Sequence, residues 1–142
     1  MTPSPAETET TIHRLHPLRV LVSGRDRRFV RVTSFLLSQR GYDVAQTSPR
    51  KTLETVQQHR SDVVLLETSN LRVIVARQVA ALQALPVAPS VLVAFEGDED
   101  NSSWQGLSTV KKWTPIETLV EEIEAAALAR PAQLTESERA YL

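Results

Sequence analysis

Short apolar runs alternate with longer segments of helical periodicity along most of the chain. The runs are rich in β-branched residues and contain few polar positions, which is typical of strands buried on both faces of a parallel sheet. They are LRVLVS at 18–23, YDVAQT at 42–47, DVVLLE at 62–67, SVLVAF at 90–95 and a weaker run at 107–111. The pattern therefore predicts five strands.

The segments between these runs predict helices. Residues 27–40 carry an apolar stripe at helical spacing, and Gly41 is suited to end that helix. Ser48 and Pro49 are favourable first residues for a second helix, and two more are expected at about 71–85 and 114–130. Side chains expected to face the core are Phe29, Val32, Phe35, Leu36 and Leu37 in the first helix, and Ile74, Val75, Val79, Leu82 and Leu85 in the third.

Strands that alternate with helices predict an α/β fold, because each right-handed crossover places a helix over one face of a parallel sheet. We expect a five-stranded, flavodoxin-like sheet of order 2-1-3-4-5 with helices on both faces. Residues 96–106 are polar and rich in turn-forming residues, so the helix between the fourth and fifth strands is expected to be shortened or absent. Residues 1–17 are expected to form a flexible arm, and residues 131–142 a C-terminal tail.

Composition narrows the function classes. The chain has 142 residues, a formal net charge of −1 and no cysteine. It fits one domain, lacks the basic excess of a dedicated nucleic-acid binder, and excludes disulfides, thiolate catalysis and cysteine-bound zinc. No apolar run is long enough to span a membrane, and the first residues do not read as a secretory signal, so we expect a cytoplasmic protein.

Residues at the predicted strand ends resemble the receiver domain of bacterial response regulators in two-component signal transduction. The matching segments are RVLVSGRD, DVVLLE, PSVLVAFEGDE and VKKWTPIE. The resemblance runs from about Leu18 to Leu128, and we expect one receiver-like domain over residues 18–130. It implies an acidic cluster for magnesium after the first strand, a phosphate-accepting aspartate after the third, a hydroxyl residue after the fourth and a lysine after the fifth.

The chain departs from that pattern at most of these positions. Gly24 and Arg25 replace the acid pair and leave only Asp26, Glu67 stands at the phosphoacceptor position, and Ala94 replaces the hydroxyl residue. Magnesium requires several hard oxygen ligands, and phosphoryl transfer without it loses its main electrostatic stabilisation. The sequence therefore predicts a degenerate pocket with no magnesium, no other cofactor, no phosphorylation and no enzymatic activity.

The charges in this pocket suggest a substitute for the metal. We hypothesise a permanent cluster of Arg25, Glu67 and Lys111, with Lys112 as the second choice for the lysine. The alternative is that these are ordinary exposed charges at strand ends, worth about 0–1 kcal/mol.

The leading functional interpretation is a pseudo-receiver that binds a signalling protein or a second copy of itself, with no membrane or nucleic-acid partner expected. Trp104 and Trp113 are the candidate interface residues, since aromatic residues at a polar rim often anchor interfaces. Trp104 can equally fold over the core, and for Trp113 a core or edge position is favoured over an anchor. Two alternatives stay open. One is a flavodoxin-like domain that binds a small ligand or nucleotide at its strand ends, and the other is a competent receiver that uses Glu67 or Asp26.

Overall fold

Five strands and the helices between them alternate along the chain, in a computed structural model that describes residues 16–68, 72–96 and 108–129. The strands are β1 (Arg19–Ser23), β2 (Asp43–Thr47), β3 (Val63–Thr68), β4 (Ser90–Phe95) and β5 (Ser108–Lys111). The helices are α2 (Arg27–Gln39), the short 3-10 helix η1 (Pro49–Lys51), α3 (Thr52–His59), α4 (Arg72–Gln83) and α5 (Ile116–Ala129).

All strands pair in parallel, in the order β2-β1-β3-β4-β5, which confirms the predicted flavodoxin-like sheet. The segment in which a shortened or missing helix was expected, between β4 and β5, lies outside the described residues. So does most of the predicted N-terminal arm, and so does the predicted C-terminal tail.

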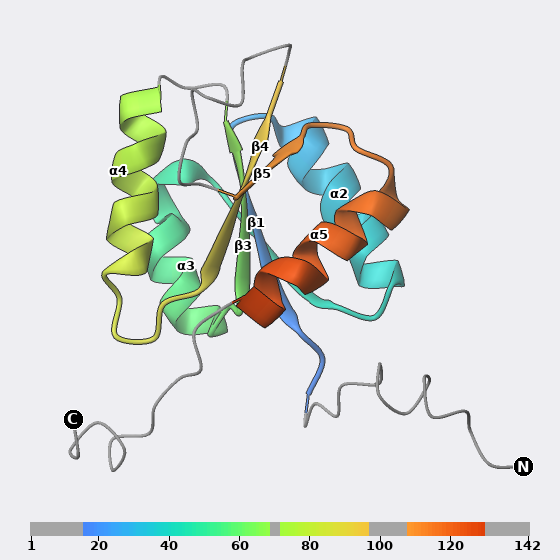
Figure 1. The fold of residues 1–142 in the computed structure, drawn as a ribbon, viewed down its shortest axis with the longest axis horizontal. Coiled ribbons are helices and arrows are strands. Elements are labelled where there is room, and N and C mark those ends of the chain that lie inside the picture. The colour runs from blue at the N-terminus through green and yellow to red at the C-terminus, as the bar shows by residue number, and fades with distance from the viewer. Residues whose placement is uncertain (1–15, 69–71, 97–107, 130–142) are drawn as a thin grey trace, which may run out of the picture.

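The two faces of the sheet are covered by different helices (Figure 1). On one face, α2 and α5 pack over alternate strand residues such as Val20, Leu65 and Leu92. On the other face, α3 and α4 pack over the intervening residues such as Leu21, Leu66 and Val93. Because side chains alternate along a strand, the sequence position of a residue decides on which face it lies.

Local sequence explains where α2 begins and ends. The Asp26 side chain caps its first turn, with Oδ1 accepting a hydrogen bond from the Phe29 amide at 3.1 Å. After the helix, Gly41 adopts a φ of +91°, a left-handed conformation in which glycine has no steric penalty.

Three of the predicted core residues are instead on the surface. The side chains of Val32 and Phe35 on α2 are 39% and 61% exposed, and Ile74 on α4 is 43% exposed. On each helix the apolar residues cover a wider face than the part that packs on the sheet. Val32, Phe35 and Ile74 lie at the outer margin of that face and reach solvent. No helix in the described part of the chain is long and apolar enough to cross a membrane.

Candidate functional site

Four residues at the carboxyl ends of β1, β3, β4 and β5 lie on the same face of the sheet. They are Gly24, Glu67, Ala94 and Lys112. Each comes two positions after a strand residue that packs under α2 and α5, namely Val22, Leu65, Leu92 and Val110. Glu67 pairs with Ala94 in the register of β3 and β4. The Lys112 amide donates to the Phe95 carbonyl at 2.6 Å, which extends the β4–β5 pairing by one residue. Strand alternation therefore brings these positions together.

The Glu67 carboxylate is held inside this edge of the sheet. Its side chain is 0% exposed. Oε2 accepts hydrogen bonds from the backbone amides of Arg25 at 3.0 Å and Asp26 at 3.4 Å. Oε1 accepts from Lys112 Nζ at 3.2 Å. Backbone donors and an ammonium thus compensate a buried carboxylate that would otherwise be strongly destabilising.

Lys112 is the cation at the centre of the site. Its side chain is only 4% exposed, and Nζ lies 2.7 Å from Asp26 Oδ2 and 3.6 Å from Glu96 Oε2, in addition to Glu67. The same ammonium lies 5.6 Å from the centre of the Phe29 ring, within the range of a cation–π contact. We call Asp26, Glu67 and Lys112 the ion cluster.

The contacts of the ion cluster shift the acid–base behaviour of its members. The hydrogen bond from Lys112, followed by the bond from the Phe29 amide, holds the pKa of Asp26 below its usual value. Burial lowers the pKa of Lys112, but its hydrogen bonds to Asp26 and Glu67 outweigh this effect, so the net pKa is raised. Both shifts favour the charged forms of Asp26 and Lys112 at neutral pH.

Gly24 makes room for the longer side chain of Glu67. A Cβ atom on Gly24 would lie 2.5 Å from Glu67 Oε2 and 2.7 Å from Glu67 Cβ, both closer than real side chains approach. The sequence suggested only that Gly24 is a lost acid. The structure shows that its missing side chain leaves the space through which the Glu67 carboxylate reaches the amides of Arg25 and Asp26.

Two members of the predicted charge cluster are placed differently. Lys112, and not Lys111, contacts Glu67; Lys111 is exposed at the end of β5. Because side chains alternate along a strand, Lys112 lies on the same side of the sheet as Val110, two residues before it. This alternation is the sequence signal that favours Lys112 over Lys111. Arg25 binds Glu67 through its backbone amide, while its side chain makes no ion pair among the described residues.

The resemblance to receiver domains implies a magnesium ion at this edge of the sheet. Among the described residues, the side chains there do not form a site for it. Ala94 is fully buried beside Glu67 and offers only a methyl group. Within the part of the chain that the structure describes, no group of three or more His, Asp or Glu side chains is arranged to hold a metal ion. The carboxylates of Asp26 and Glu67 instead surround the Lys112 ammonium, so the donor set does not fit the ion.

Trp113 lies beside the ion cluster with 48% of its surface exposed. Its ring packs edge-on against Phe29, with the ring centres 5.3 Å apart, and the Arg28 guanidinium lies 5.8 Å from its ring centre. It is therefore partly packed on the domain and partly available. The other candidate interface residue, Trp104, lies outside the described residues.

Sequence comparison alone does not place the chain. No protein-family model matches it, and no curated protein matches it either.

Comparison with solved structures gives a consistent result for the fold. The chemotaxis response regulator CheY4 of Vibrio cholerae matches with 18% identity and a TM-score of 0.67, over 78% of this chain and 98% of that one. The receiver domain of NarL from Mycobacterium tuberculosis matches with 22% identity and a TM-score of 0.67, over 81% and 99%. The receiver domain of a LuxO repressor protein from Vibrio parahaemolyticus matches with 13% identity and a TM-score of 0.65, over 85% and 100%.

Proposed function

We propose that this chain, which has the fold of a response-regulator receiver domain, is a signalling module that is not phosphorylated and acts through protein contacts. It is a pseudo-receiver and not an enzyme. The observation that carries this proposal is the state of Glu67 at the phosphoacceptor position.

Phosphoryl transfer requires an accessible carboxylate oxygen in line with the phosphodonor, and a cation that neutralises the developing charge. The Glu67 side chain is 0% exposed, and its two oxygens accept hydrogen bonds from the amides of Arg25 and Asp26 and from Lys112. Attack on a phosphodonor would require Glu67 to leave these donors. The cluster therefore supports a fixed conformation in which the Glu67 carboxylate is not available for attack.

Incubation with acetyl phosphate and magnesium, followed by intact-mass measurement, tests this proposal. We expect the mass of the chain to stay unchanged while a phosphorylatable receiver in the same buffer gains a phosphate. Any phosphate that appears on the wild-type chain would contradict the proposal. Its absence from Glu67→Gln would identify Glu67 as the phosphoacceptor, and its persistence there would point to another residue such as Asp26.

An exposed apolar patch supports the protein contact. Val32 and Trp113 line a hollow of about 220 Å³ between α2 and the start of α5. Phe35 lies one helical turn from Val32 on α2, with 61% of its surface exposed. We call Val32, Phe35 and Trp113 the apolar patch. Large apolar and aromatic side chains gathered beside a hollow are typical of interface anchors.

The first contact to test is with a second copy of the chain. We expect sedimentation equilibrium to show a reversible dimer, and Phe35→Ser to weaken its association at least about tenfold. Leu128→Ser on α5 removes a comparably exposed leucine and should leave association unchanged. A wild-type chain that stays monomeric at all concentrations would contradict self-association and leave a separate protein as the proposed partner.

A further inference from the structure

A second hollow opens at the carboxyl ends of β1 and β2, outside the ion cluster and the apolar patch. Its volume is about 620 Å³, within the range of about 300–1,000 Å³ found for small-molecule pockets. None of its lining residues is acidic, and four are arginines: Arg25, Arg27, Arg31 and Arg50. We call these four residues and the hollow between them the arginine groove.

Among the described residues, no acidic side chain forms an ion pair with the arginines of the groove. The whole chain has a net charge of −1. All four groove arginines are exposed, and none forms an ion pair with another described residue. Elsewhere, Arg19 and Arg40 are paired with Asp43 and Glu117. A concave surface lined by a single sign of charge concentrates the field and attracts ions of the opposite sign.

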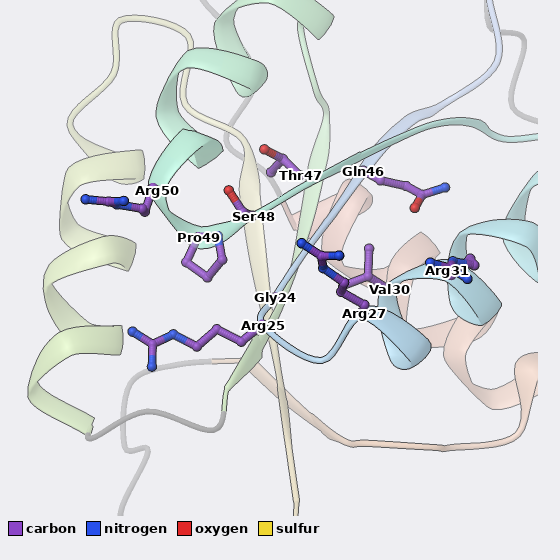
Figure 2. Close-up of a pocket in the computed structure, with 10 residues that line it drawn as sticks. All are labelled: Gly24, Arg25, Arg27, Val30, Arg31, Gln46, Thr47, Ser48, Pro49 and Arg50. Atoms are coloured by element: carbon purple, nitrogen blue, oxygen red, sulfur yellow. The ribbon is translucent and has the colours of Figure 1, made fainter.

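The arginines come from three segments that the fold brings together (Figure 2). Arg25 lies in the turn after β1, Arg27 and Arg31 belong to α2, and Arg50 belongs to η1. In Figure 2, Arg25 and Arg50 extend toward α4, Arg27 projects from the start of α2 toward the segment that holds Thr47 and Ser48, and Arg31 lies on α2. Like charges four residues apart on a helix are destabilising, so an anion between these segments would relieve their repulsion.

The rest of the lining fits an organic molecule better than a bare ion. Thr47, Ser48 and Gln46 contribute polar groups, while Val30 and Pro49 contribute apolar surface. The Ser48 side chain does not cap η1, so its hydroxyl is not used by that helix. Small organic ligands bind through such a combination of polar groups and apolar surface, whereas a bare ion uses only the polar groups.

We propose that the arginine groove binds an organic phosphate with two or more phosphate groups, of the nucleoside polyphosphate class. Guanidinium groups bind phosphate oxygens in a bidentate manner, and several of them at separate positions match several phosphates. The acidic residues of the chain, 17 against 16 lysines and arginines, favour a small ligand over an extended nucleic acid. Neither Glu67 nor any residue of the apolar patch lines the groove, and only Gly24 and the Arg25 backbone connect it to Glu67. Binding through the arginine side chains can therefore hold or fail separately from the proposed function.

Isothermal titration calorimetry with ATP, inorganic pyrophosphate and inorganic phosphate tests the proposal. We expect ATP and pyrophosphate to bind, each at least about tenfold more tightly than inorganic phosphate. The double variant Arg27→Gln/Arg50→Gln should weaken ATP binding at least about tenfold, a loss of about 1.4 kcal/mol. Arg28→Gln is the matched control, because Arg28 contacts Trp113 and not the groove, and it should leave the affinity within about twofold.

Three results would overturn the proposal. The first is no measurable binding of ATP or pyrophosphate at about millimolar concentration. The second is an equal loss of affinity in Arg28→Gln, which would indicate general charge attraction. The third is tighter binding of a single-stranded oligonucleotide than of ATP at the same salt concentration, which would reassign the groove to nucleic acid. Thermal melts of each variant should match the wild type, since all the replaced side chains are exposed.

Discussion

Replacing Lys112 with methionine is expected to lower the free energy of unfolding by about 3 kcal/mol, measured by urea denaturation at neutral pH. Methionine has an unbranched side chain of similar length but lacks the ammonium that contacts Asp26, Glu67 and the Phe29 ring. The buried carboxylate of Glu67 then keeps only two backbone donors. A buried charge that loses its partner is costly because no water replaces the lost interaction.

The neighbouring lysine provides the control. Lys111→Met removes the same charge from an exposed position and should change the free energy of unfolding by less than about 0.5 kcal/mol. The double variant Lys112→Met/Glu67→Met should recover most of the loss, since an apolar pair often replaces a buried ion pair without penalty. Equal effects of Lys111→Met and Lys112→Met would show that the ion cluster contributes no stability.

The difference in unfolding free energy between the wild type and Lys112→Met should become smaller at acidic pH. The pKa of Asp26 is lowered in the folded chain, so its contribution is present above the unfolded value of about 3.9 and is lost as pH falls through the folded value. Lys112→Met removes the largest cause of that shift. The gap in stability between the wild type and Lys112→Met should therefore narrow below about pH 4.

Gly24→Ala is expected to lower the free energy of unfolding by about 1–3 kcal/mol, measured by urea denaturation. The added methyl group would meet Glu67 Oε2 at 2.5 Å and Glu67 Cβ at 2.7 Å. Either the carboxylate leaves its donors or the backbone of β1 moves away from β3, and both are unfavourable.

A second background tests whether the clash with Glu67 is the cause. In Glu67→Ala the carboxylate is absent, so the contact at 2.5 Å disappears and only the Cβ contact remains. In this background Gly24→Ala should lower the free energy of unfolding by less than it does in the wild type. The difference between the two values is the coupling energy between positions 24 and 67. The same cost in both backgrounds would indicate that Gly24 is required for a reason unrelated to Glu67.

The strands could be predicted closely because each is a continuous apolar run bounded by polar or turn-forming residues. The observed strand bounds differ from the predicted ones by no more than one residue, and β4 is the same. The surface of the helices was less predictable. Periodicity does not show how much of an apolar stripe the sheet covers, and this is why Val32, Phe35 and Ile74 proved to be exposed.

The sequence names the residues at the carboxyl edge of the sheet but does not show how they contact one another. Gly24, Glu67 and Ala94 lie near one another because they stand at the carboxyl ends of adjacent parallel strands. The family pattern favours Lys111, whereas the alternation of side chains along β5 correctly places Lys112 on the side of Glu67. Backbone donors such as the Arg25 amide have no signature in a sequence, so the way in which Glu67 is held required the structure.

The cation at the centre of the ion cluster is covalently attached to the chain. The Lys112 ammonium lies 2.7 Å from Asp26 and 3.2 Å from Glu67 on a side chain that is 4% exposed. A tethered counter-ion has a fixed effective concentration and cannot dissociate into solution or be removed by a chelator. This positive charge is consequently in place as soon as the chain folds, without an ion from solution.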